Sequence, residues 1–137
     1  MTIVSAASRQ ARQAPAKNFT GSVFQDPLAK ADGVSKMNAT TVTFNPGART
    51  VWHKHDTRQV LVCTVGVGIL QFRGESAKAM RPGDVATVQP GLEHWHGASA
   101  NSLFSHISLI DSAPEGTDWG EPVTDGDYQT ANTQIHA

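Results

Sequence analysis

The chain has 137 residues, 39% of them hydrophobic, and its formal net charge is −1. This length suits a single domain that buries most of its apolar side chains without disulfides. Because the charges nearly cancel and neither sign forms a run, we expect no nucleic-acid partner and no binding to an anionic membrane. The single cysteine, Cys63, lies in an apolar run and is predicted to be a buried small hydrophobic residue.

The N-terminal residues 1–17 are rich in Ala, Ser, Gln and Arg and contain Pro15. They lack the hydrophobic segment of a secretory signal, and no apolar run in the chain has membrane-spanning length, so we expect a cytoplasmic protein. We predict that this segment is an arm that is partly ordered, or that adds an edge strand to a neighbour.

A β-barrel or β-sandwich is predicted over residues 18–112. Alternating and β-branched runs predict short strands, and turn-forming Gly, Pro, Asn and Asp separate them. The predicted strands are residues 19–25, 39–44, 50–55, 59–64, 68–73, 85–89, 94–96 and 102–110. This series of short strands, without convincing helical periodicity between them, predicts an all-β single-domain fold.

The C-terminal residues 113–137 are polar and contain Gly, Pro and Asp. We expect this irregular tail to pack on the barrel, with Trp119 and Val123 as the docking residues. At most one helical turn is predicted, at residues 125–129, and the end of the chain is expected to fray.

Two imidazoles and a carboxamide are predicted to share one face of the sheet. His53, His55 and Gln59 are separated by even numbers of residues, and side chains alternate on extended backbone. His94, in another predicted strand, offers a third imidazole. Imidazole ligands suit several divalent transition metals, so the pattern indicates a metal site. The alternatives are a polar surface strand and, for His94, a buried histidine bonded to the backbone.

The spacing of glycines around these residues follows a known pattern. Gly47, His53, His55, Gln59 and Gly66 resemble the first motif of the cupin superfamily, which has Glu where this chain has Gln59. The second motif matches at Gly83, Gly91 and His94, whereas Gln89 replaces the usual Pro and Ala98 the usual Asn. The resemblance covers about residues 40–110 and implies a small jelly-roll-like β-barrel with the metal inside.

A closer resemblance covers most of the chain. The stretches FTGSV, DPL, VTFNPGART, RPGDV, EHWHGA and DW are similar to those of the small manganese-dependent cupin hydroxynitrile lyases, which cleave cyanohydrins such as (R)-mandelonitrile into an aldehyde and hydrogen cyanide. This resemblance implies His106 as the active-site histidine and, as metal ligands, His53, His55, Gln59 and His94. Ile110 replaces a glutamine of that family, and Thr40 a residue that is commonly alanine; both departures fall in the expected pocket.

The ligand set indicates which chemistry the metal would support. Three neutral imidazoles and one amide oxygen leave one or two positions open on an octahedral ion, as a catalytic metal requires. Gln59 leaves the full +2 charge of the ion, which favours Lewis-acid chemistry and disfavours the trivalent state that oxygen activation needs. The ligand set does not single out one metal; the family resemblance implies Mn²⁺ first, with Fe²⁺, Co²⁺, Ni²⁺ and Zn²⁺ as alternatives.

Further residues are candidates for the substrate pocket or for proton transfer. Thr40 and Val42 share one face of a strand, with ordinary barrel packing as the alternative. His96 is predicted to support a ligand or to form a pocket wall with Ile110, rather than to bind the metal itself. His106 is a candidate proton shuttle, since an imidazole exchanges protons near pH 7, and a core histidine is the alternative.

The leading functional prediction is a metal-dependent hydroxynitrile lyase that acts on a small molecule and assembles as a homodimer or homotetramer. One alternative is a metal-dependent cupin oxygenase or isomerase that acts on a small aromatic or sugar-derived acid. Another is a non-catalytic cupin that binds a small ligand. Oxygen consumption distinguishes the oxygenase from the lyase, because a lyase needs no oxygen.

Overall fold

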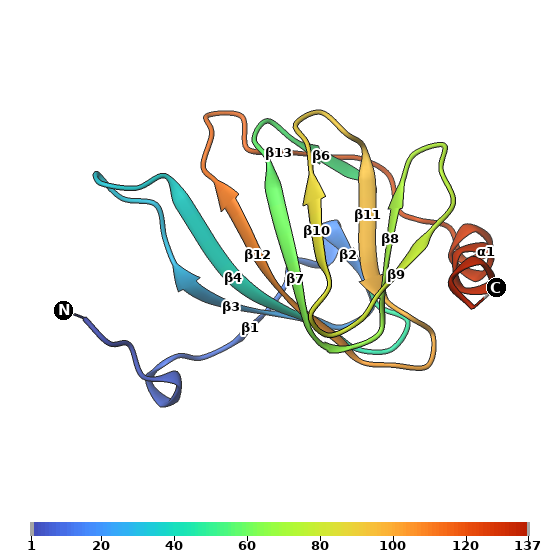
Figure 1. Ribbon diagram of the computed structural model, residues 1–137, viewed down its shortest axis with the longest axis horizontal. Coiled ribbons are helices and arrows are strands. Elements are labelled where there is room, and N and C mark those ends of the chain that lie inside the picture. Colours follow the sequence, from blue (N-terminus) through green and yellow to red (C-terminus); the bar gives the residue numbers. More distant parts are fainter. Residues whose placement is uncertain (1, 137) are drawn as a thin grey trace.

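The computed structural model describes residues 2–136 and has two antiparallel β-sheets that form a barrel (Figure 1). The first sheet has the strand order β1 (Arg12–Gln13), β3 (Val23–Ala29), β4 (Met37–Phe44), β12 (Phe104–Asp111), β7 (Gln59–Gly66) and β10 (Val85–Val88). The second has the order β13 (Thr117–Trp119), β6 (His53–His55), β11 (His94–Ala98), β5 (Arg49–Thr50) and β2 (Phe19–Thr20), and β8 (Gly68–Phe72) joins β11 to β9 (Lys78–Met80). The prediction of an all-β domain is confirmed.

The N-terminal segment adds an edge strand to its own chain. Strand β1 pairs with β3, and the short 3-10 helices η1 (Ala6–Ser8) and η2 (Ala16–Asn18) flank it. Arg9 Nε lies 3.1 Å from Asp26 Oδ1, and the backbone N–H of Ala14 donates to the carbonyl of Val23. These contacts hold the segment against the first sheet of the same molecule.

Strand β12 lies between β4 and β7 at the centre of the first sheet. His106 is opposite Val42 on β4, and Ile110 is opposite Gln59 on β7. Directly opposed residues of antiparallel strands point to the same face of a sheet. The register therefore turns these four side chains toward the interior of the barrel together.

The predicted strand over residues 50–55 is wrong in one respect, because the structure divides it into β5 and β6. Gly97 of β11 is opposite Arg49, whereas His94 is opposite His53, so this side carries one residue more than β11 and forms a bulge. The backbone N–H groups of Val51 and Trp52 bond to carbonyls outside the ladder. The extra residue changes the side-chain alternation before His53.

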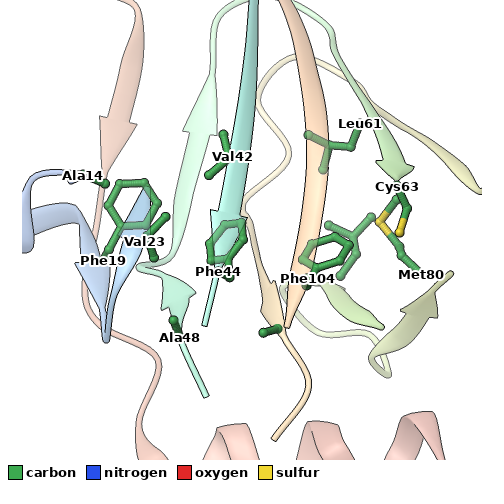
Figure 2. Close-up of a cluster of buried hydrophobic side chains, with 12 residues drawn as sticks. Ala14, Phe19, Val23, Val42, Phe44, Ala48, Leu61, Cys63, Met80 and Phe104 are labelled. Carbon is green, nitrogen blue, oxygen red and sulfur yellow. The ribbon is translucent and has the colours of Figure 1, made fainter. Parts of the chain in front are cut away.

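Two apolar clusters stabilise the fold. The first lies inside the barrel and includes Phe44, Leu61 and Phe104, each fully buried. Figure 2 shows the side chains of this cluster. Cys63 belongs to this cluster and is buried, as predicted. The second cluster lies between the outer face of the second sheet and the C-terminal helix, and includes Trp95, which is completely buried.

The C-terminal tail contains a longer helix than predicted. Helix α1 spans Asp125–Ile135 and lies beside β8 and β9 at one side of the barrel (Figure 1). Thr124 caps it by accepting from the N–H of Asp127, and Tyr128 and Ala131 are buried against the sheet. The expectation of a single turn is wrong, because these contacts stabilise a helix with little apolar periodicity of its own. The predicted fraying extends to residue 137, which lies outside the described residues. Among the described residues, no helix is both long and apolar enough to cross a bilayer.

Candidate metal centre

The sheet pairing brings the predicted ligands together at one end of the barrel. His53 and His94 are directly opposed on β6 and β11, and their ring centroids are 4.3 Å apart. The ring of His55 lies 5.0 Å from His53 and 5.4 Å from His94. Gln59 begins β7, and all four side chains are buried. Polar side chains with so little exposure require partners.

The ring orientations of His53 and His94 suit a metal ligand. The Nδ1 atom of His53 is 2.8 Å from the carbonyl of Val51, and that of His94 is 2.8 Å from the carbonyl of Leu92. A carbonyl only accepts, so Nδ1 carries the proton and Nε2 keeps its lone pair. His94 Nε2 is buried and has no hydrogen-bond partner among residues 2–136. A bound cation would satisfy it.

His55 and Gln59 contact each other. His55 Nε2 lies 3.1 Å from Gln59 Oε1, and His55 Nδ1 lies 2.8 Å from the hydroxyl of Thr117 on β13. The amide nitrogen of Gln59 donates to Ser108 Oγ at 2.9 Å, which directs Oε1 toward His55. An imidazole nitrogen and an amide oxygen thus lie side by side next to the two opposed histidines.

His96 lies close to two of the predicted metal ligands, His53 and His94. Ligand atoms of His53, His94 and His96 lie within 4.8 Å of one another. The rings of His94 and His96 are nearly parallel, with centroids 5.9 Å apart. His96 Nδ1 is also 3.2 Å from His106 Nε2. The structure therefore gathers five histidines, and His53, His94 and His96 form a trio whose ligand atoms are close enough to hold a metal, whereas the predicted third imidazole ligand is His55.

Burial keeps these imidazoles neutral. Desolvation is the main cause that lowers the pKa of His53, of His94 and of His96, and neighbouring histidines lower the pKa values of His53 and His96 further. Desolvation also lowers the pKa of His55 to about 4 and the pKa of His106 to about 3. Metal binding requires neutral imidazole, so the buried trio fits a divalent cation.

A cavity of about 170 Å³ adjoins the clustered histidines. One wall is formed by His53, His55, Gln59 and His96. The other residues that line it are Phe19, Gln25, Thr40, Val42, Thr50, His106, Ser108, Ile110, Thr117 and Trp119. The residues predicted for the pocket and for proton transfer thus border the same space as the predicted ligands, except for His94, which is completely buried behind them.

Six residues of this cavity were not assigned to the site from the sequence: Phe19, Gln25, Thr50, Ser108, Thr117 and Trp119. Thr50 faces the cavity because the bulge before His53 changes the side-chain alternation. Thr117 and Trp119 reach it because β13 pairs with β6, where they are opposite His55 and His53. The Trp119 ring lies 4.8 Å from the His53 ring. The alternation of Thr117 and Trp119 is the only local signal, and it is too short to predict a strand.

Comparison with known proteins assigns the family. Residues 40–104 match the family described as "Cupin domain". Over 130 residues the chain is 38% identical to the (R)-mandelonitrile lyase of Granulicella tundricola, and the match covers 94% of this chain and 99% of that protein. The chain belongs to the cupin family.

Solved cupin structures agree with this assignment. A cupin-like protein from Thermotoga maritima is 36% identical, with a TM-score of 0.84 over 87% of this chain and 91% of its own. The polyketide cyclase RemF from Streptomyces resistomycificus is 15% identical, with a TM-score of 0.73 over 98% of each chain, and it shows the fold alone. Cupins with such different names share this barrel, so activity has to be argued from the site.

Proposed function

We propose that this cupin is a metal-dependent hydroxynitrile lyase that cleaves a cyanohydrin into an aldehyde and hydrogen cyanide. The observation that carries the proposal is the position of His106, which borders the same cavity as the metal-binding histidines and is bonded to His96. The 38% identity to an (R)-mandelonitrile lyase supports the same reaction class.

The metal would be held by His53, His55, Gln59 and His94. The Nδ1–H groups of two of these histidines donate to backbone carbonyls, which leaves each Nε2 free to bind. When bound, a divalent ion supplies Lewis-acid stabilisation to the oxygen of the substrate. We expect Mn²⁺ in this position because of the resemblance to the manganese-dependent cupin hydroxynitrile lyases, since imidazole and amide donors by themselves suit several divalent metals.

The walls of the cavity are suited to a small organic substituent. Val42, Ile110, Phe19 and Trp119 present apolar surface, and hydroxyl groups of the lining provide a few polar contacts. Ligand sites usually combine mostly apolar walls with a small number of placed polar groups. Ile110 lines this cavity, and we expect its side chain to influence which substituents of the cyanohydrin fit.

His106 performs the proton transfer. Cleavage moves the hydroxyl proton of the cyanohydrin to a base, breaks the bond between the carbinol carbon and the nitrile carbon, and returns a proton to the departing cyanide. Burial lowers the pKa of His106, so its imidazole is neutral at pH 7, and its buried Nδ1, which has no partner among the described residues, is the nitrogen that takes the proton as it leaves the hydroxyl. Its protonated form is a strong acid and gives that proton to cyanide, a much stronger base, so the products are aldehyde and HCN.

The test is a cleavage assay with racemic mandelonitrile and other cyanohydrins. We expect the Mn²⁺-loaded protein to release benzaldehyde faster than the metal-stripped protein, after subtraction of the reaction without protein, and to consume no oxygen. No aldehyde above this background from any cyanohydrin would contradict the proposal. Oxygen consumption by the Fe²⁺-loaded protein with a small aromatic acid would favour an oxygenase instead.

A further inference from the structure

The predicted histidine ligands differ in what holds their Nδ1 atoms. His53 and His94 face backbone carbonyls, which can only accept a hydrogen bond. His55 Nδ1 instead lies 2.8 Å from the hydroxyl of Thr117, which can accept or donate. The backbone therefore fixes the tautomers of His53 and His94, whereas it leaves the tautomer of His55 open.

The other ring nitrogen of His55 faces an acceptor. His55 Nε2 is 3.1 Å from Gln59 Oε1, an amide oxygen that cannot donate. This bond exists only when Nε2 carries the proton, and Thr117 then donates to the bare Nδ1. A cation on Nε2 requires the opposite tautomer, in which Nδ1–H donates to Thr117. The two states demand opposite roles of one hydroxyl.

We propose that Thr117 is a positioning residue of the metal centre, whose hydroxyl turns between donor and acceptor so that His55 can adopt the ligating tautomer without leaving a buried nitrogen unpaired. This inference rests on the metal centre of the proposed function. Thr117 lies outside residues 40–104 that match the cupin domain, and it reaches the site because it is opposite His55 in the pairing of β13 with β6. Figure 1 shows β13 beside β6 at the upper edge of the barrel.

The test compares metal binding by three variants. Thr117→Val keeps the shape of the side chain and removes the hydroxyl, and we expect its affinity for Mn²⁺ to fall by about 10- to 100-fold, the effect typical of losing an outer partner of a ligand. Thr117→Ser restores the hydroxyl and is expected to recover most of the affinity. Thr57→Val is the matched control, because the hydroxyl of Thr57 donates to the carbonyl of Asp111 at 2.7 Å instead of to a histidine.

A spectroscopic measurement tests the tautomer directly. The ¹⁵N shifts of the His55 ring, recorded with and without diamagnetic Zn²⁺, report which nitrogen carries the proton. We expect the proton on Nε2 without metal and on Nδ1 with it in the unaltered protein and in Thr117→Ser. In Thr117→Val, we expect the proton to move from Nε2 to Nδ1 only at a higher Zn²⁺ concentration.

The outcomes separate this inference from the proposed function. Equal Mn²⁺ affinity of Thr117→Val and the unaltered protein would overturn the role of Thr117, as would equal losses in Thr117→Val and Thr57→Val. A specific loss in Thr117→Val, together with an unaltered protein that cleaves no cyanohydrin, would leave this inference standing and refute the lyase. An unaltered protein that binds no divalent metal would refute both.

Discussion

His106 Nε2 lies 3.2 Å from His96 Nδ1, and both rings are buried at the wall of the cavity. At this distance one nitrogen donates and the other accepts, so the two imidazoles share a single proton at their contact. His106 Nδ1 is buried without a partner in the described part of the chain. The pair therefore joins His96, a member of the buried trio with His53 and His94, to His106 on the opposite sheet.

Removal of the His106 imidazole should reduce catalysis and leave metal binding intact. A positioned acid–base group contributes about 10²- to 10⁴-fold, and we expect His106→Ala to lower kcat for cyanohydrin cleavage by that range. Metal content per chain, measured on the same preparation, should equal that of the unaltered protein, because His106 is not among the predicted ligands. An unchanged kcat would show that His106 does not transfer the proton.

The stability of the metal-free protein should depend on pH through its buried histidines. Burial lowers the pKa of His55 to about 4 and of His106 to about 3, below the unfolded value near 6.5. The unfolded chain then binds more protons than the folded one below pH 6.5, so the free energy of unfolding is highest above that pH and falls as pH decreases toward 4. Denaturant titrations after chelation would measure this fall. In His106→Asn the decrease should be shallower by about one proton, roughly 1.4 kcal/mol per pH unit, and an identical slope would contradict the burial argument.

Arg49 anchors the start of helix α1. Its Nη2 donates to the carbonyl of Val123 at 2.8 Å and to Asp125 Oδ1 at 2.9 Å, and its guanidinium lies 4.3 Å from the ring centre of Tyr128. Arg49 is buried, so we expect Arg49→Lys to destabilise the protein by about 1–3 kcal/mol and to increase hydrogen exchange in α1.

Asp125→Asn provides the control for Arg49. The carboxylate of Asp125 is 93% exposed, so its ion pair with Arg49 contributes little. We expect the variant to differ from the unaltered protein by less than about 0.5 kcal/mol. If Asp125→Asn were as destabilising as Arg49→Lys, the ion pair rather than the buried carbonyl bond would hold the helix.

Gly97 permits the close approach of β11 to β5. A methyl group at this position would lie 2.5 Å from the carbonyl oxygen of Ala48 and 2.6 Å from Cα of Arg49. We expect Gly97→Ala to cost about 1–3 kcal/mol in thermal or chemical unfolding, and to weaken metal binding because His94 and His96 lie on the same strand.

Gly126→Ala is the matched control for Gly97→Ala. A methyl group at Gly126 would meet nothing within 4 Å, and the residue lies within α1. Replacement of an unstrained helical glycine by alanine should stabilise the protein by about 0.5–1 kcal/mol. If both variants were destabilised, the close packing of β11 against β5 would not be the cause of the stability loss in Gly97→Ala.

The sequence predicts the part of the site that depends on local alternation. The even spacing of His53, His55 and Gln59 predicts one face, and the structure gathers these residues with His94. The bulge that turns Thr50 toward the cavity depends on pairing between distant strands, so periodicity within one segment does not indicate it. The same is true of Thr117, which reaches the site only through β13.

The sequence predicts only one turn of helix α1, at residues 125–129, for a related reason. Its sequence has few apolar residues, and the two that are buried, Tyr128 and Ala131, dock against a surface that exists only in the folded barrel. Tertiary packing and the Thr124 cap, rather than intrinsic propensity, stabilise this segment. The roles assigned to His55, Gln59 and His106 remain predictions that metal analysis and kinetics can test.

Metal stoichiometry is the most direct test of the proposed centre. The purified protein should bind about one divalent transition metal per chain, as measured by elemental analysis and by titration after chelation. His94→Ala should abolish this binding, because His94 Nε2 is a buried nitrogen that has no hydrogen-bond partner among residues 2–136 and keeps its lone pair for a cation. A protein that takes up no metal, or a His94→Ala variant that binds as tightly as the unaltered chain, would contradict the account.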